Sequence, residues 1–244
     1  MANASPPGYY RTGGEGRPGS LTGSAYREVR RRVLHLELAP GARFTEKAVA
    51  GELGMSKTPV HEALALLAED GFVEVLPRSG YRVSRVTLRS ARELFDLHRA
   101  LEQDAAAAVA RRPAEVVAPV AREGAWVRDA RPVEGPDAWL DRYTRLHLLL
   151  GELAGNRHLR RALGGTLHAH HRLLRLCVAA GGPHLRSIAG DDAPLLDALA
   201  AGDPNAARHA VHTRLTGCRE RVLDALLSSD ALLDVNIAGP TPGP

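Results

Sequence analysis

Polar side chains cluster at the start of a short segment whose apolar residues recur at helical spacing. The polar face carries Ser56, Lys57, Thr58 and His61. The opposite, apolar face carries Val60, Ala63, Leu64 and Leu67. Hydroxyl groups and a lysine at the start of a helix suit phosphates and base edges in a DNA major groove, and the helix N-terminus itself favours a phosphate. The segment therefore predicts a DNA-recognition helix.

Elements on both sides of this segment must hold it in place. Apolar spacing and Gly/Pro breaks predict helices over about 22–36, over 45–54 with Thr45 as N-cap, and from Ser56 to Gly71. Two β-rich runs, 72–76 and 81–86, follow, and the loop between them is Pro77-Arg78-Ser79-Gly80. This order predicts a winged helix-turn-helix over residues 21–86, with Arg78, Ser79 and Gly80 against the DNA backbone. A protein-interaction winged helix, with Lys57 merely solvated, is the alternative.

A second set of polar residues lies on apolar stripes of later segments. The stripes are Leu140, Tyr143, His147, Leu150, Ala154; Ile188, Asp192, Leu195, Leu199; and Ala207, Val211, Arg214, Cys218. A buried charge is costly unless it is paired or liganded, so we expect something to compensate it.

Two interpretations of this set remain open from the residues alone. In the structural one, Asp192 and Arg214 form an ion pair, and Tyr143 and His147 hydrogen-bond within the core. In the functional one, the groups line a pocket in which Arg214 and His147 donate to an anionic or carbonyl-bearing ligand. His98 and His170 lie on inward stripes of their own and join the candidates, whereas a solvated or structural role is expected for His168 and His171.

The remainder of the chain has a helical pattern. Helices are predicted at 89–112, 114–130, 136–154, 157–178, 185–201 and 204–227, separated by Gly and Pro. The prediction is a mainly α protein, with an all-helical bundle of six to seven helices over 87–228. The Gly- and Pro-rich ends, 1–20 and 229–244, are predicted to be disordered tails.

Composition fits a partner that is a polyanion. The 244 residues carry a net charge of +4, and residues 1–86 hold twelve Lys and Arg against nine Asp and Glu, a surplus of three. No apolar run approaches the ~20 residues of a membrane-spanning helix, and no apolar stretch of a secretory signal is present. The two cysteines, Cys177 and Cys218, have no metal-type spacing and are expected to be buried free thiols. We therefore expect a cytoplasmic protein without membrane partners.

The run LAPGARFTEKAVAGELGMSKTPVHEALALLAEDGFVEVLPRSGYRV resembles the N-terminal domain of the GntR family of bacterial regulators. That family has PG, R-x-T-E, LA-x-x-LG, S-[RK]-TPV-x-EAL and a P-x-x-G wing. The predicted DNA-binding set, to which the resemblance adds Lys47, is Arg43, Lys47, Ser56, Lys57, Thr58, His61, Arg78, Ser79 and Gly80. The family usually has Arg where this chain has His61, so we expect an altered base preference there.

Residues 89–227 resemble the helical FCD effector domain of the FadR-type branch. The matching runs are ELFDLHRALE, LHLLLGELAGN and LLDALAAGDPNAARHAV. In many members an Asp and three His hold a divalent metal. Here His147 fits the first His, but Tyr143, Asp192 and Arg214 stand at the other three positions, so the resemblance implies no family-type metal and no cofactor. The predicted effector-binding set is His98, Tyr143, His147, His170, Asp192 and Arg214.

The resulting prediction is a homodimeric transcriptional regulator, a repressor, that binds a palindromic operator and answers to a small effector in its helical domain, with an anion among the candidate effectors. It is not expected to be an enzyme. Two alternatives are a helical metal-dependent hydrolase with an accessory DNA-binding domain, and a regulator that has lost its ligand and answers to a partner protein.

Overall fold

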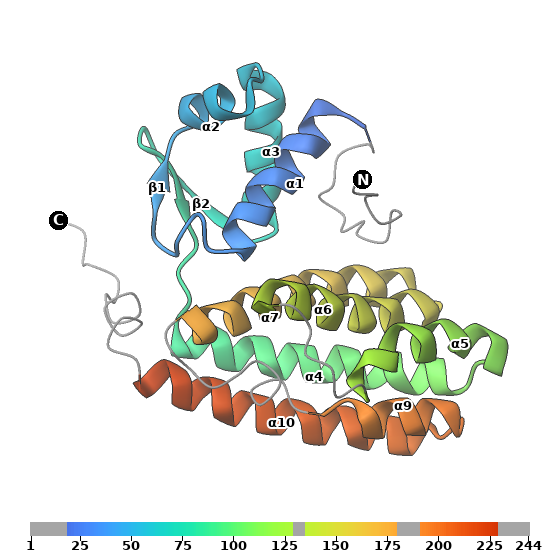
Figure 1. The fold of residues 1–244 in the computed structure, drawn as a ribbon. Coiled ribbons are helices and arrows are strands. Elements are labelled where there is room, and N and C mark those ends of the chain that lie inside the picture. The colour runs from blue at the N-terminus through green and yellow to red at the C-terminus, as the bar shows by residue number, and fades with distance from the viewer. Residues whose placement is uncertain (1–18, 129–134, 180–190, 229–244) are drawn as a thin grey trace.

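The chain folds into two bodies, each with its own hydrophobic core. The computed structural model describes residues 19–128, 135–179 and 191–228 (Figure 1). One core lies among the N-terminal helices and the small sheet, and the larger one lies within a bundle of helices. Element labels follow Figure 1, in which α8 is not used.

The N-terminal body is a winged helix-turn-helix, as predicted. It consists of α1 (Leu21–Leu34), β1 (Arg43–Phe44), α2 (Glu46–Leu53), α3 (Lys57–Glu69), β2 (Val73–Leu76) and β3 (Gly80–Val83). The three strands form an antiparallel sheet in the order β1-β3-β2. The sequence predicts only the hairpin β2–β3. Strand β1 is two residues long, too short to show the alternation that identifies a strand.

Side chains at the helix starts fix the boundaries of this body. The Ser20 hydroxyl accepts a hydrogen bond from the backbone N–H of Gly23, and the Thr45 hydroxyl accepts one from the backbone N–H of Ala48. Ser56 occupies the N-cap position of α3, as predicted, but its side chain makes no capping hydrogen bond. Its hydroxyl is therefore not committed to the helix.

The second body is all helical. It consists of α4 (Leu88–Ala110), α5 (Ala114–Glu123), the 3-10 turn η1 (Gly124–Val127), α6 (Gly135–Leu153), α7 (Arg157–Ala179), α9 (Ala193–Ala200) and α10 (Pro204–Ser228). Helix α4 is central and packs against α6, α7, α9 and α10 (Figure 1). Both cysteines are buried free thiols.

Two predicted helices differ from those observed. The predicted helix 114–130 is shorter than expected: α5 ends at Glu123 and the chain tightens into the 3-10 turn η1. Here it lies close to α9, and a Cβ at Gly124 would lie 2.7 Å from Leu196 Cδ2. The predicted helix 185–201 begins in residues outside the described ranges, and its described part is α9, with Asp192 as the N-cap. The predicted tails lie outside the described residues except for Gly19 and Ser20.

The two bodies touch along α1 and α7. The ring of His35 lies edge-on to that of His171, with 6.0 Å between centroids, and His35 Nδ1 is 3.2 Å from Asp137 Oδ1. His171 is also 3.0 Å from the Thr144 hydroxyl. His168 and His171 are almost fully buried, so of the two roles expected for them, solvated or structural, burial excludes the solvated one. Among the described residues, no helix is long and apolar enough to cross a membrane.

The wing requires a glycine where β3 begins. Gly80 has a φ of +86°, and a Cβ there would lie 2.5 Å from the Phe44 carbonyl oxygen of β1. We predict that Gly80→Ala lowers the free energy of unfolding by about 1–3 kcal/mol, measured by urea denaturation.

Gly51→Ala is the matched control for this change. Gly51 lies on the exposed face of α2, and a Cβ there would meet nothing within 4 Å. Because alanine favours helix over glycine by about 0.5–1 kcal/mol, this variant is expected to be as stable as the native chain or more so. A Gly80→Ala variant equally stable would contradict the assignment of strain to the wing.

Candidate nucleic-acid interface and buried polar centre

The first turn of α3 presents its polar side chains to solvent. Ser56, Lys57, Thr58 and His61 are all exposed. The opposite face is fully buried, with 0% exposure for Val60, Ala63, Leu64 and Leu67. The buried apolar face holds α3 in the domain. The exposed polar turn can therefore bind a partner while the domain stays folded.

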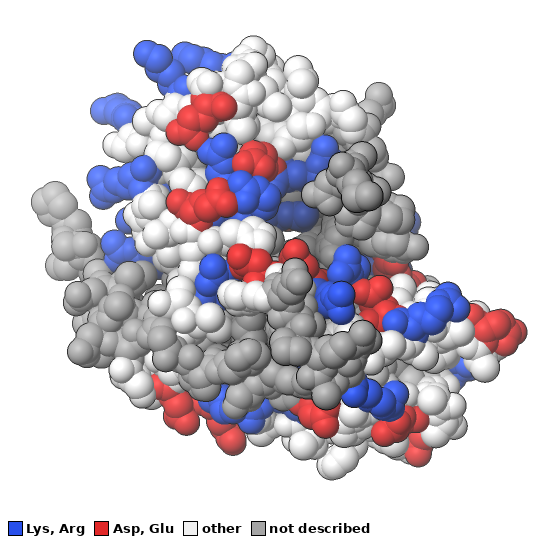
Figure 2. All heavy atoms as spheres, viewed as in Figure 1, with Lys and Arg blue, Asp and Glu red and all other residues white. Residues whose placement is uncertain are grey.

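The cations of this face differ from three other arginines of the domain in having no acidic partner among the described residues. Arg31, Arg32 and Arg82 each form an ion pair with glutamate. Among the described residues, no ion pair is formed by the exposed side chains Arg43, Lys47, Lys57 and Arg78. Figure 2 shows Lys and Arg side chains along the left edge of the upper, N-terminal body. Unpaired cations are available to a polyanion at no cost in broken ion pairs.

Two predicted contact residues have other partners in the structure. His61 Nδ1 lies 2.9 Å from Glu46 Oε2, which leaves Nε2 as the ring atom free to meet a base. Gly80 is half-buried against β1, so close packing explains why a glycine occupies this position. Arg78 and Ser79 are exposed at the tip of the wing.

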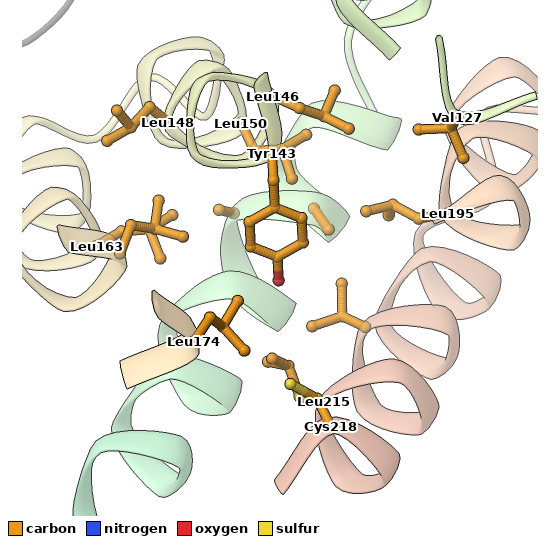
Figure 3. Close-up of a cluster of buried hydrophobic side chains, with 14 of the residues drawn as sticks. Val127, Tyr143, Leu146, Leu148, Leu150, Leu163, Leu174, Leu195, Leu215 and Cys218 are labelled. Carbon is orange, nitrogen blue, oxygen red and sulfur yellow. The ribbon is translucent and has the colours of Figure 1, made fainter. Parts of the chain in front are cut away.

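The six candidate residues of the helical body come together in its interior. They lie on α4, α6, α7 and α10 and at the N-cap of α9, and none is more than 4% exposed: His98, Tyr143, His147, His170, Asp192 and Arg214. Figure 3 shows Tyr143 pointing into the core between Leu174, Leu195 and Leu215. We call these six residues and Glu102 the buried polar centre.

Glu102 is the hub of this centre and was not predicted from the sequence. Its Oε1 lies 2.7 Å from Arg214 Nη2 and 2.6 Å from His147 Nδ1. Its Oε2 lies 2.6 Å from His98 Nε2. Glu102 follows His98 by one helical turn, and this i,i+4 spacing is the signal that could have found it. The apolar stripe of α4 that guided the prediction runs through His98 and Leu101. Glu102 lies beside this stripe, and for that reason it was missed.

Arg214 uses its whole guanidinium group. Nε lies 2.9 Å from Asp192 Oδ1, Nη2 donates to Glu102, and Nη1 donates to the Tyr143 hydroxyl. Asp192 Oδ2 is also 3.3 Å from His147 Nε2. The ion pair between Asp192 and Arg214 that the structural interpretation predicts is therefore present.

Charge is balanced within the centre. Burial lowers the pKa of His147, but the carboxylates of Glu102 and Asp192 outweigh burial and raise this pKa to about 8. Burial raises the pKa of both carboxyl groups, but Arg214 and His147 hold them below their ordinary values. At neutral pH two cations, Arg214 and protonated His147, therefore face two carboxylates.

The other two histidines are neutral. Burial lowers the pKa of His98 and lowers that of His170 still further. Their rings meet edge to face at 4.7 Å, and His170 Nε2 is 3.6 Å from the Cys218 sulfur. Both rings are therefore uncharged: His98 meets Glu102 through Nε2, and His170 packs beside the charged residues.

The residues do not fit the divalent cation that many members of the family hold. A guanidinium cannot ligate a metal, and that of Arg214 lies between the carboxylates of Glu102 and Asp192. A metal ion would add a third cation to a set of charges that is already balanced. From outside, a hollow of about 540 Å³ between α9 and α10 reaches Arg214, with Asp191, His209, Thr213 and Arg221 along its walls.

Comparison with known proteins identifies both bodies. The family model described as bacterial regulatory proteins, gntR family, matches residues 21–83, and the FCD domain model matches residues 93–217. Together they cover the winged helix and most of the helical body.

Individual relatives agree with these matches. The "Probable D-xylose utilization operon transcriptional repressor" of Paenarthrobacter nicotinovorans is 31% identical over 176 residues, which are 70% of this chain and 75% of that protein. A Streptomyces ambofaciens protein named "Uncharacterized HTH-type transcriptional regulator in unstable DNA locus" is 52% identical over 61 residues. That match covers 25% of this chain and only 26% of the relative.

A solved structure shares the whole architecture. The structure of E. coli McbR/YncC matches with a TM-score of 0.71 at 23% identity, over 84% of this chain and 98% of that one. At this identity the likeness shows the fold. The two family matches show the rest: the chain belongs to the GntR family, in the branch with an FCD domain, and is an HTH-type transcriptional regulator rather than an enzyme.

Proposed function

We propose that the chain is a homodimeric repressor that reads a palindromic operator and responds to a small molecule bound at the buried polar centre. The observation that carries the DNA-binding half is the exposed first turn of α3, in which Lys57 and the hydroxyls of Ser56 and Thr58 have no acidic partner among the described residues. The repressor assignment is supported by the name of the Paenarthrobacter relative.

Recognition would use α3 in the major groove and the wing on the flanking backbone. Lys57 and the hydroxyls of Ser56 and Thr58 can meet phosphates or base edges, while Arg78 and Ser79 meet phosphates. A single head of this size reads only a few base pairs. Two heads related by a two-fold axis would read two half-sites spaced by the DNA repeat, which supports the proposal of a dimer and a palindrome.

The buried polar centre supports a mechanism in which an anionic ligand replaces one of its carboxylates. Because Arg214 and His147 are already balanced by Glu102 and Asp192, an anionic effector would have to take the place of one carboxylate. Such an exchange would move α4 or α9 relative to α10. A ligand that prefers the rearranged state shifts the population toward it.

The same balance favours one alternative, a regulator that has lost its ligand and answers to a partner protein. The two are separated by thermal-shift screening against organic acids, sugar acids and acyl-CoA esters. Stabilisation by one class, together with a change in operator affinity on the upstream region of its own gene, supports the effector. Stabilisation by none supports the alternative.

Lys57 tests the DNA-binding face directly. We predict that Lys57→Ala weakens binding to a duplex from the upstream region and lowers the slope of log affinity against log salt by about 1, because one phosphate contact is lost. Fluorescence anisotropy over a salt series measures both quantities.

Arg89→Ala is the control for this prediction. Arg89 is equally cationic and highly exposed, but lies on α4, away from the proposed interface, and pairs with Glu93. Its removal should leave the slope unchanged. The proposal fails if the native chain shows no salt-sensitive binding, or if both variants keep the native slope.

His147 should make stability depend on pH. Its pKa of about 8 in the folded chain exceeds the ordinary 6.5, so its contribution is complete below pH 6.5 and is lost as pH rises through 8. We predict that the native chain loses about 1 kcal/mol more unfolding free energy between pH 7 and 9 than His147→Gln does. Urea denaturation at the two pH values measures the difference, and equal losses in both chains would contradict it.

A further inference from the structure

A second cavity lies between the two bodies, away from the buried polar centre. Its volume is about 170 Å³. Its walls come from the turn after α3, the linker after β3, the first turns of α4 and the middle of α7. Apolar side chains form much of the lining: Phe72, Val86, Ala91, Leu94 and Leu173.

The cavity also holds a buried cation without an anion. Arg172 of α7 lines it and is only 5% exposed. Its Nη2 donates to the backbone carbonyl of Ser84 in the linker, and its Nε has no acceptor among the described residues. Within the same residues, no carboxylate forms an ion pair with Arg172. Burial lowers its pKa to about 10, so it stays charged at neutral pH.

An unpaired buried guanidinium is unusual because such a charge costs several kcal/mol when nothing compensates it. The other buried arginine of this body, Arg214, meets two carboxylates. The charged neighbours at the rim of the cavity do not supply the missing anion. Asp70 is exposed, and its carboxylate accepts a hydrogen bond from the Tyr26 hydroxyl at 2.5 Å. Arg85 is a second cation in the lining of the cavity.

We propose that this interdomain cavity binds a small organic carboxylate with an apolar body, whose anionic end pairs with Arg172. The volume suits this class, because an engineered apolar cavity of about 150 Å³ holds benzene. The first turn of α4, which contributes Ala91, adds the positive end of a long helix. The bound molecule would touch the turn after α3, the linker and α7 at once.

Sodium benzoate is the probe for this site. Titrated into the full chain at constant ionic strength, benzoate is expected to raise the unfolding midpoint, whereas sodium chloride and benzamide are not. Calorimetry should show binding that Arg172→Met weakens at least about tenfold. Methionine replaces the aliphatic part of the side chain and removes the charged guanidinium.

A second variant fills the cavity and leaves the charge of Arg172 unchanged. Ala169→Phe fills the cavity from α7 and should abolish benzoate binding while leaving Arg172 in place. Arg208→Met is the control, since Arg208 pairs with Asp104 on the far helices. Circular dichroism checks that each variant is folded.

The inference is overturned if benzoate shifts the midpoint no more than chloride and benzamide do, or if folded Arg172→Met and Ala169→Phe both keep native binding. No step of the test uses DNA. Failure of the repressor proposal would therefore leave this result unaffected, and its own failure would leave the operator-binding proposal standing.

Discussion

A guanidinium group buried in a helical bundle constrains everything packed around it. Arg214 is shielded from solvent, so its charge must be compensated inside the protein. The carboxylates of Glu102 and Asp192 provide this compensation. Removing one partner of such a pair leaves an uncompensated charge and costs about 3–5 kcal/mol. Since these residues come from α4, α10 and the start of α9, the ion pairs fix three elements against one another. His147 and Tyr143 add α6 to the same centre.

Helix α7 links this centre to the DNA-binding head. Its His170 packs against His98 in the buried polar centre, whereas the next residues face the other body. His171 meets the ring of His35 at the C-cap of α1, and Arg172 donates to the backbone carbonyl of Ser84 in the linker. A rearrangement of the centre that moved α7 would therefore bear directly on the pose of the head. The contacts form one continuous packed path from the interior of the bundle to the winged helix.

Much of this arrangement follows from periodicity in the sequence. The stripes that carry Tyr143, His147 and Arg214 are continuous over several turns, so their inward direction could be predicted, and so could the face of α3 that carries Lys57. Asp192 was placed correctly although it precedes its helix, because the N-cap also faces the core. Glu102 was missed because a charged residue beside a stripe looks like a solvated one until its partners are known.

Other features depend on tertiary contacts that no local pattern contains. Strand β1 exists because β3 lies beside it, and the glycine at position 124 is explained only by Leu196 of α9, which lies against it. His168 and His171 were expected to be solvated or structural. They are buried because a second domain covers them, which the sequence of α7 alone does not reveal.

A double-mutant cycle on Glu102 and Arg214 tests the central constraint most directly. Glu102→Gln, Arg214→Met and the double variant would be unfolded in urea near neutral pH. If the guanidinium and carboxylate compensate each other, the double variant should lose at least about 2 kcal/mol less than the two single losses added together. Strictly additive losses would show that the pair is not coupled and would contradict the role assigned to Arg214.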